Sequence, residues 1–264
     1  MARVIAVTNQ KGGVGKTTTC VNLAASLAAT KRRVLLVDMD PQGNATMGSG
    51  VDKNSLQLSG YDVLTKRASA AEVIVRAEAS GFDILPANGD LTAAEVELMN
   101  EIGREHRLRL TLNTVRENYD YILIDCPPSL NLLTVNALSA SDSVLIPMQC
   151  EYYALEGLAA LMNTVEQIKE TVNPNLEVEG ILRTMYDPRN SLTLDVSGQL
   201  NEYFGDKVYR AVIPRNVRLA EAPSYGMPAL AYDRASKGAI AYLALAGEMV
   251  RRHGSKKTSA AVAV

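Results

Sequence analysis

The chain has 264 residues, of which 47% are hydrophobic and 21% are charged, and its formal net charge is −2. This length and composition suit one large α/β domain. The three cysteines, Cys20, Cys126 and Cys150, lie far apart, which excludes a disulfide framework and a cysteine metal site. No stretch approaches ~18 uninterrupted apolar residues, and the first apolar run begins too close to Met1 for a signal peptide. We therefore expect a cytoplasmic protein without a membrane span.

The charge is distributed unevenly along the chain. Residues 1–200 hold 17 Lys/Arg and 24 Asp/Glu, a balance of −7, whereas residues 201–264 hold 10 and 5, a balance of +5. Such an asymmetry indicates either a polyanion-binding face or a solvated basic end, and charge alone does not separate the two.

Apolar runs alternate with helical patterns from the first residues to about 252. Strands are predicted at 4–7, 33–37, 82–86, 119–124, 143–147, 178–185 and 207–213. Helices are predicted at 20–29, within 91–114, and at 130–140, 154–171, 191–204 and 236–252. Continuous apolar strands separated by helices predict a doubly wound, mostly parallel sheet with helices on both faces. Residues 1–252 would form this single domain, and 253–264 a flexible C-terminal tail.

A glycine-rich loop follows the first strand, at residues 8–19, Thr-Asn-Gln-Lys-Gly-Gly-Val-Gly-Lys-Thr-Thr-Thr. Glycines between a buried strand and a helix let backbone N–H groups approach phosphate oxygens, as in P-loop NTPases. Lys16 would bind the β- and γ-phosphates, and the Thr17 hydroxyl would ligate Mg²⁺. The residues predicted to bind ATP here are Lys11, Gly12, Gly13, Val14, Gly15, Lys16, Thr17 and Thr18.

The loop departs from the common pattern at its start, where Gln10 takes the place of the first glycine and Lys11 follows it. This form resembles the deviant Walker A ATPases of the ParA/MinD superfamily. The resemblance implies that Lys11 reaches across a dimer to the partner's nucleotide, so that ATP and dimerisation are linked. A solvated surface lysine is the alternative.

Two aspartates follow apolar strands, where the sheet would place a ligand. Asp40 lies in Asp38-Met39-Asp40-Pro41, and its carboxylate could orient water beside the γ-phosphate. Asp125 ends the strand before Cys126 and would hold the Mg²⁺ hydration shell. In the resembling family these segments are the first and second switches. A turn residue before proline and a helix cap are the respective alternatives.

The segment from Ile213 to Pro228 contains Pro-Arg-Asn-Val-Arg-Leu-Ala-Glu-Ala-Pro-Ser. It closely resembles a stretch diagnostic of the ParA/Soj partitioning ATPases, in which Pro214 and Asn216 would lie against the adenine. With the other motifs, the resemblance extends over about residues 2–252. Because the loop begins at residue 11, the chain is similar to the short chromosomal type, and we expect no operator-binding domain before it.

The resemblance also implies partners. An ATP-bound homodimer would bind double-stranded DNA without sequence preference, with Arg189 and Arg218 as principal contacts. A ParB-like centromere-binding protein would stimulate slow hydrolysis, and the protein would be cytoplasmic and nucleoid-associated. Arg189 and Arg218 could instead be ordinary solvated residues. Basic residues that could extend the DNA face are Lys207, Arg210, Arg215, Arg234, Lys237, Arg251 and Arg252.

Three other classes of protein share this glycine-rich loop. A MinD-like regulator would bind membranes through an amphipathic C-terminal helix, but residues 251–264 carry glycine and small side chains instead of bulky apolar ones. A nitrogenase-type reductase would need cluster-binding cysteines in motifs that are absent here. A metabolic ATP-dependent ligase or kinase stays open, because sequence alone does not exclude a second substrate pocket.

Overall fold

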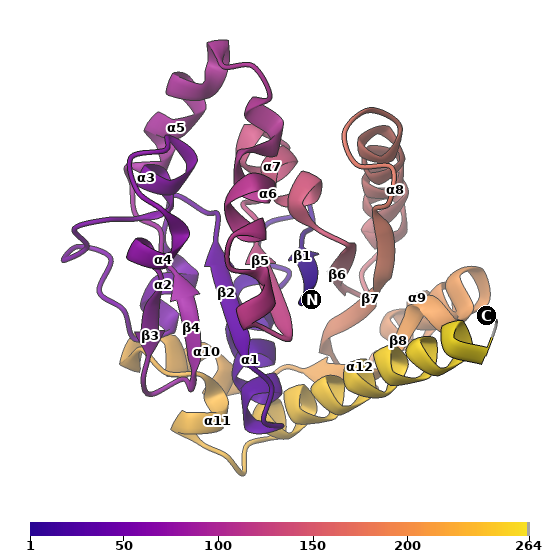
Figure 1. The fold of residues 1–264 in the computed structure, drawn as a ribbon. Coiled ribbons are helices and arrows are strands. Elements are labelled where there is room, and N and C mark those ends of the chain that lie inside the picture. The colour runs from indigo at the N-terminus through magenta and orange to yellow at the C-terminus, as the bar shows by residue number, and fades with distance from the viewer. Residues whose placement is uncertain (263–264) are drawn as a thin grey trace.

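The computed structural model describes the backbone of residues 1–262 and the side chains of residues 1–254. Its centre is an eight-stranded sheet in the order β3-β4-β2-β5-β1-β6-β7-β8 (Figure 1). All neighbouring strands are parallel except β3 and β4. The strands are β1 (Arg3–Val7), β2 (Val34–Asp38), β3 (Val75–Ala77), β4 (Phe82–Leu85), β5 (Tyr121–Asp125), β6 (Ser143–Gln149), β7 (Glu177–Tyr186) and β8 (Val208–Pro214). The predicted doubly wound sheet is confirmed.

The central strands are apolar on both sides because helices cover both faces of the sheet. On β1, Val4 and Ala6 join one buried cluster, whereas Ile5 and Val7 join the other. Successive strand residues point to opposite faces, so each short strand contributes to two cores. With no tryptophan in the chain, both cores are filled largely by Val, Leu, Ile and Ala.

Helices α5 to α8 pack on one face, and α1 and α12 on the other (Figure 1). The helices are α1 (Lys16–Ala29), α2 (Asn44–Gly48), α3 (Gly60–Leu64), α4 (Ala70–Val73), α5 (Leu91–Glu97), α6 (Arg107–Asn113), α7 (Leu132–Ala140), α8 (Ala154–Thr171), α9 (Ser191–Phe204), α10 (Val217–Glu221), α11 (Ala229–Tyr232) and α12 (Lys237–Val262). The helical region expected within 91–114 is thus split into α5 and α6. Strand β3, which pairs antiparallel with β4, was not predicted.

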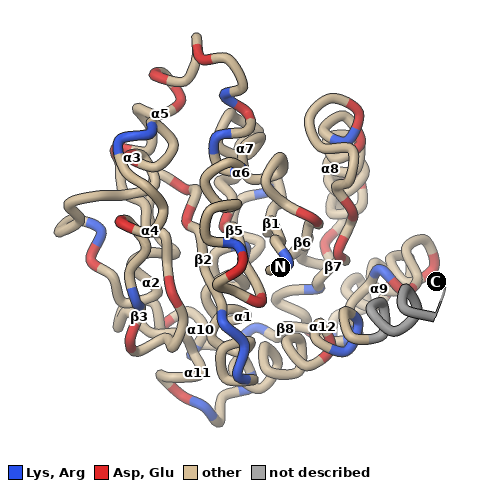
Figure 2. Tube along the Cα trace, viewed as in Figure 1, with Lys and Arg blue, Asp and Glu red and all other residues tan. Residues whose placement is uncertain are grey.

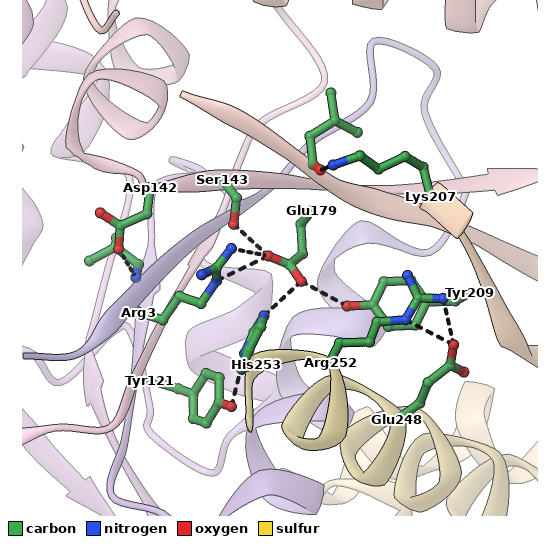
Figure 3. A network of polar contacts seen from close by, with 12 residues as sticks. Arg3, Tyr121, Asp142, Ser143, Glu179, Lys207, Tyr209, Glu248, Arg252 and His253 are labelled. Carbon is green, nitrogen blue, oxygen red and sulfur yellow. Dashed lines mark hydrogen bonds and ion pairs between the residues drawn. The ribbon is translucent and has the colours of Figure 1, made fainter. Parts of the chain in front are cut away.

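Helix α12 continues past residue 252, where the sequence prediction ended it. The end of this helix contacts a buried carboxylate, that of Glu179 on β7, whose side chain is 3% exposed (Figure 3). It accepts hydrogen bonds from Arg3 Nη2 (2.9 Å), Ser143 Oγ (2.8 Å) and Tyr209 OH (3.0 Å), and its Oε1 lies 2.8 Å from His253 Nε2. His253, assigned to the tail by sequence, is therefore bound to the sheet. The side chains of the tail beyond 254 lie outside the described residues.

Candidate functional site

The glycine loop connects β1 to the N-terminus of α1, at the carboxyl edge of the sheet. Gly13 and Gly15 have φ of +72° and +89°, a left-handed conformation that only glycine adopts without strain. Gly15 directly precedes α1, so the loop ends where helical N–H groups point outward. The structure therefore forms an anion cradle at this position.

Lys16 is the first residue of α1 and is 7% exposed. Its Nζ donates to the main-chain oxygen of Lys11 at 3.1 Å, across the mouth of the loop. Burial lowers the pKa of the Lys16 ammonium, and the charges of Asp125 and Asp40 are among those that oppose this fall. The fold thus brings Lys16, Asp40 and Asp125, which are distant in sequence, close enough for their charges to interact.

Lys11 points away from the loop. Its Nζ forms an ion pair with Glu151 Oε2 at 2.6 Å, and both side chains are about half exposed. Glu151 follows β6, so this contact depends on the sheet order and had no sequence signal. The Lys11 ammonium is consequently presented at the surface of the molecule.

Asp38 and Asp125 end the neighbouring strands β2 and β5 at the same level. Burial raises the pKa of Asp125 to about 8, and the neighbouring Asp38 adds to this rise while the Thr17 hydroxyl opposes it. Within the described residues, Asp125 Oδ2 is buried and has no hydrogen-bond partner. A buried, unpaired carboxylate oxygen beside a threonine hydroxyl fits a hydrated divalent cation. The described part of the chain holds no group of three or more His, Cys, Asp or Glu side chains placed to ligate a metal directly.

Asp38, which sequence reasoning gave no role, supports the first of the predicted switches. Thr46 donates to its Oδ2 through both the backbone N–H (2.8 Å) and Oγ1 (2.7 Å). The backbone N–H of Asp40 donates to Asp38 Oδ1 at 3.1 Å. These bonds fix the start of the loop and leave the half-buried Asp40 side chain bonded only to the nearby N–H of Gln42, at 3.0 Å, within the described residues.

A cavity of about 420 Å³ opens beside the loop. Pro214 and Asn216, the residues predicted to contact the base, line it together with Gly15 and Thr18 of the predicted phosphate site. Its remaining lining residues are Thr184, Met185, Ile213, Arg215, Val217, Leu219, Ala220 and Tyr242. The structure thus joins the two predicted halves of a nucleotide site, one ionic and one mostly apolar.

Sequence reasoning missed Thr184 and Met185 at the end of β7. Thr184 Oγ1 donates to the main-chain oxygen of Val14 at 2.8 Å, which ties the loop to β7. Met185 has φ of +48°, a strained conformation for a side chain of this size. Neither residue type has a motif, so only the fold identifies them.

The two predicted DNA-contacting arginines lie outside the cavity, beyond the ends of the adjacent strands β7 and β8. Arg189 is 88% exposed and forms an ion pair with Asp187 at 2.8 Å. Arg218 in α10 contacts Glu221 at 2.7 Å and Asp233 at 3.2 Å. Both guanidinium groups are thus at the surface and held by carboxylates.

Among the described residues, none of the helices combines the length and the hydrophobicity that a membrane span requires.

The chain is similar to known proteins over nearly its whole length. A family model described as an AAA domain matches residues 2–178. The sporulation initiation inhibitor protein Soj of Bacillus subtilis is 55% identical over 249 residues, covering 94% of this chain and 98% of that protein. The chromosome partitioning protein ParA of Caulobacter vibrioides is 51% identical over 261 residues, covering 98% of each. Among solved structures, cobyrinic acid a,c-diamide synthase from Mycobacterium smegmatis, with bound ATP analog and magnesium, has a TM-score of 0.85, 38% identity and 97% coverage of both chains.

A glycine cradle at a helix N-terminus, a buried loop lysine and acidic strand ends define a P-loop ATPase with a second lysine at the start of its loop. The sequence identities to Soj and ParA, which extend over nearly the whole chain, show which family of P-loop ATPases this is. The chain belongs to the ParA/Soj family of chromosome-partitioning ATPases.

Proposed function

We propose that this protein is a DNA-segregation ATPase that binds DNA without sequence preference as an ATP-bound sandwich dimer. The observation that carries the proposal is the outward position of Lys11, whose ammonium lies on Glu151 at the surface and not in its own loop. A lysine at the surface would reach the phosphates of a second copy by exchanging the Glu151 carboxylate for a phosphate. Dimerisation would then require ATP in both subunits.

In the proposed ATP complex, the base occupies the cavity between Pro214 and Asn216 and the phosphates lie in the cradle of residues 11–18. The phosphates replace the Lys11 carbonyl as the acceptor for Lys16. Mg²⁺, when bound, would be held by the Thr17 hydroxyl and, through water, by Asp125, and it would offset the charge of the phosphates. The buried Asn216 Oδ1, which lacks a partner within the described residues, would accept a hydrogen bond from the adenine amino group.

Hydrolysis would be slow in one subunit alone. Asp40 orients the attacking water by accepting its hydrogen bond, and Lys11 of the second copy stabilises the charge that develops on the γ-phosphate. A ParB-like partner accelerates this step and releases the dimer from DNA. The protein would thus be cytoplasmic and nucleoid-associated, and cycles of binding and release would move or position DNA cargo.

The test is binding to random-sequence duplex DNA with ATP, ADP or no nucleotide, at several salt concentrations. Asp40→Ala should bind ATP and DNA but turn over ATP at least about 100-fold more slowly, because only the water-orienting group is lost. Lys16→Ala should lose nucleotide binding and every later step. DNA binding that is equal in all nucleotide states would contradict the proposal.

Two alternatives have a distinguishing result. The M. smegmatis structure at 38% identity is named as an amide synthase, and such an enzyme requires an amide-forming substrate for turnover. ATP hydrolysis stimulated by DNA and a ParB-like protein alone would exclude that activity. A MinD-like regulator would bind anionic liposomes with ATP and leave DNA unbound.

A further inference from the structure

Helix α10 begins at an asparagine that does not cap it. Asn216 occupies the N-cap position with an extended backbone, but its side chain accepts no hydrogen bond from the helix. At the same position before α7 and α9, the side chains of Asn131 and Asn190 each accept a bond from a backbone N–H. An N-cap asparagine ordinarily satisfies a helical N–H in this way. The side-chain oxygen of Asn216 is therefore left for another donor.

The position of α10 decides where this oxygen stands. Asn216 Oδ1 is buried and, within the described residues, has no hydrogen-bond partner. Asn216 lines the cavity of about 420 Å³ beside the glycine-rich loop, and so does Leu219, which follows it in α10. Leu219 is 8% exposed and belongs to the buried cluster that includes residues of α1 and α12. A displacement of α10 would thus move both side chains within the cavity.

A glycine in the first turn of α12 sets the position of α10. A Cβ atom at Gly238 would lie 2.5 Å from Leu219 Cγ, 2.8 Å from Leu219 Cδ1 and 3.0 Å from Asn216 Oδ1. Carbon atoms in contact are ordinarily about 3.5–4.0 Å apart. α10 therefore packs against the bare main chain of Gly238. Because glycine is a poor helix former, this close approach is the reason for its place in α12.

Helix α12 is fixed on both sides of Gly238. Before it, Ser236 Oγ accepts a hydrogen bond from the Ala239 N–H at 3.2 Å and so caps the helix. After it, Tyr242 OH lies 3.1 Å from Thr19 Oγ1 of α1, and both side chains are buried. An added side chain at position 238 would consequently displace α10 and not α12.

Helix α10 has five residues, Val217–Glu221, and is held less firmly than α12. Its Arg218 forms an ion pair with Asp233 at 3.2 Å, in the loop from α11 to α12, where Figure 2 shows charged positions of both signs. A partly exposed ion pair of this kind contributes little to stability. A Cβ atom at position 238 would therefore shift α10 by about 1 Å, and Asn216 with it.

We infer that Gly238 is a positioning residue for selection of the base, an inference that rests on the proposed placement of the base in this cavity. The absence of a side chain at Gly238 lets Asn216 Oδ1 stand where it accepts a hydrogen bond from the amino group of adenine. Guanine carries a carbonyl oxygen at that position of its ring. Two acceptors would then face each other without a donor, so the cavity favours ATP over GTP.

The test compares Gly238→Ala with Gly247→Ala in the full chain. Gly247 also lies in α12, but a Cβ atom there would come no closer than 3.4 Å to another residue, at Arg251 Nη1 on a flexible side chain. Isothermal titration calorimetry with Mg²⁺ measures the affinity for ATP, for GTP and for inorganic tripolyphosphate, which has no base. We expect Gly238→Ala to bind ATP at least about tenfold more weakly and to lose most of the wild-type preference for ATP over GTP. Its affinity for tripolyphosphate should be unchanged, because the cradle of residues 11–18 stays in place, and Gly247→Ala should match the wild type with all three ligands.

Leu219→Ala supplies the rescue, because it removes the two atoms closest to the added Cβ. Gly238→Ala should therefore reduce ATP affinity less in the Leu219→Ala background than in the wild type. The double variant also relieves the overlap if Gly238→Ala alone fails to fold.

Three results would contradict the inference in different ways. If Gly238→Ala keeps the wild-type preference for ATP over GTP, Gly238 does not position Asn216. If it loses affinity for ATP, GTP and tripolyphosphate equally, its role is only structural. If the wild-type protein binds all three ligands alike, the proposed placement of the base fails and the inference fails with it, a result distinct from a loss of preference in the variant alone.

Discussion

At the scale of single residues, Asp125 shows that a residue of the proposed nucleotide site decreases the stability of the fold. Its carboxylate ends β5 among buried groups beside Asp38, and its Oδ2 has no partner within the described residues. Burial raises the pKa of Asp125 to about 8, so the folded chain holds a proton there that the unfolded chain releases near pH 4. A carboxyl group with a raised folded-state pKa decreases the stability of the fold as pH rises from its unfolded pKa to its folded pKa.

We therefore predict that Asp125→Asn raises the melting temperature of the nucleotide-free protein and abolishes Mg²⁺-dependent ATP hydrolysis. The folded-state pKa is raised, so the full cost is present only above about pH 8, and the gain in melting temperature should be larger at pH 9 than at pH 5. Thermal unfolding in EDTA at both pH values measures this. A fall in melting temperature at pH 9 would show that the carboxylate is stabilising.

Much of the phosphate site could be predicted from sequence, because Gly13, Gly15 and Lys16 lie in one contiguous loop whose chemistry depends on local backbone geometry. The residues that support the loop could not. Thr184 and Glu151 come from the ends of β7 and β6, and only the order of strands in the sheet brings them to the loop.

At the scale of elements, α12 depends on a contact between residues 74 positions apart, His253 and Glu179. Sequence reasoning ended the helix at 252 because Gly254 and small residues follow, and a partner on a distant strand leaves no local signal. Strand β3 was missed for a related reason. It has three residues and lies at the edge of the sheet, paired with β4.

We predict that His253→Ala lowers the free energy of unfolding by about 1–3 kcal/mol, because a buried carboxylate loses one of its donors. Hydrogen bonding and the charges of His253 and Arg3 overcome the effect of burial and hold the pKa of Glu179 well below its usual value. The stabilisation from this carboxylate is thus present above its unfolded pKa and is lost as pH falls below it.

Urea unfolding at pH 7 and pH 4 measures the difference between the wild type and His253→Ala. Lys169→Ala, which breaks the exposed pair of Lys169 with Glu166, is the control and should change stability little. If both variants behave alike, the contact between His253 and Glu179 does not fasten α12.

At the scale of the whole molecule, the basic C-terminal region and the adjacent ends of β7 and β8 give the proposed DNA face. The charge balance of +5 in residues 201–264 is consistent with it, but sequence could not show that Arg189 and Arg218 are each held by carboxylates. Exposed ion pairs of this kind contribute little, so a DNA phosphate can replace Asp187 or Glu221 as the partner of the guanidinium.

We predict that Arg218→Glu and Arg189→Glu each weaken binding of the ATP-bound protein to all DNA sequences alike while nucleotide binding is kept. Each lost phosphate contact should reduce the slope of log affinity against log salt by about 1 per subunit. Lys169→Glu makes the same change of charge near the end of α8, which leads into the amino end of β7, whereas Arg189 and Arg218 follow the carboxyl ends of β7 and β8. This control should alter neither quantity much. Asp187→Asn provides a test of opposite sign. It frees Arg189 from its ion pair, so affinity should rise, and most at low salt, because the competing carboxylate is gone. Fluorescence anisotropy with labelled duplexes, using Asp40→Ala in every variant to hold the ATP state, measures all four changes. If Arg189→Glu and Arg218→Glu keep the full slope of log affinity against log salt, the DNA phosphates contact another face. The excess of basic residues in 201–264 would then be a solvated basic end.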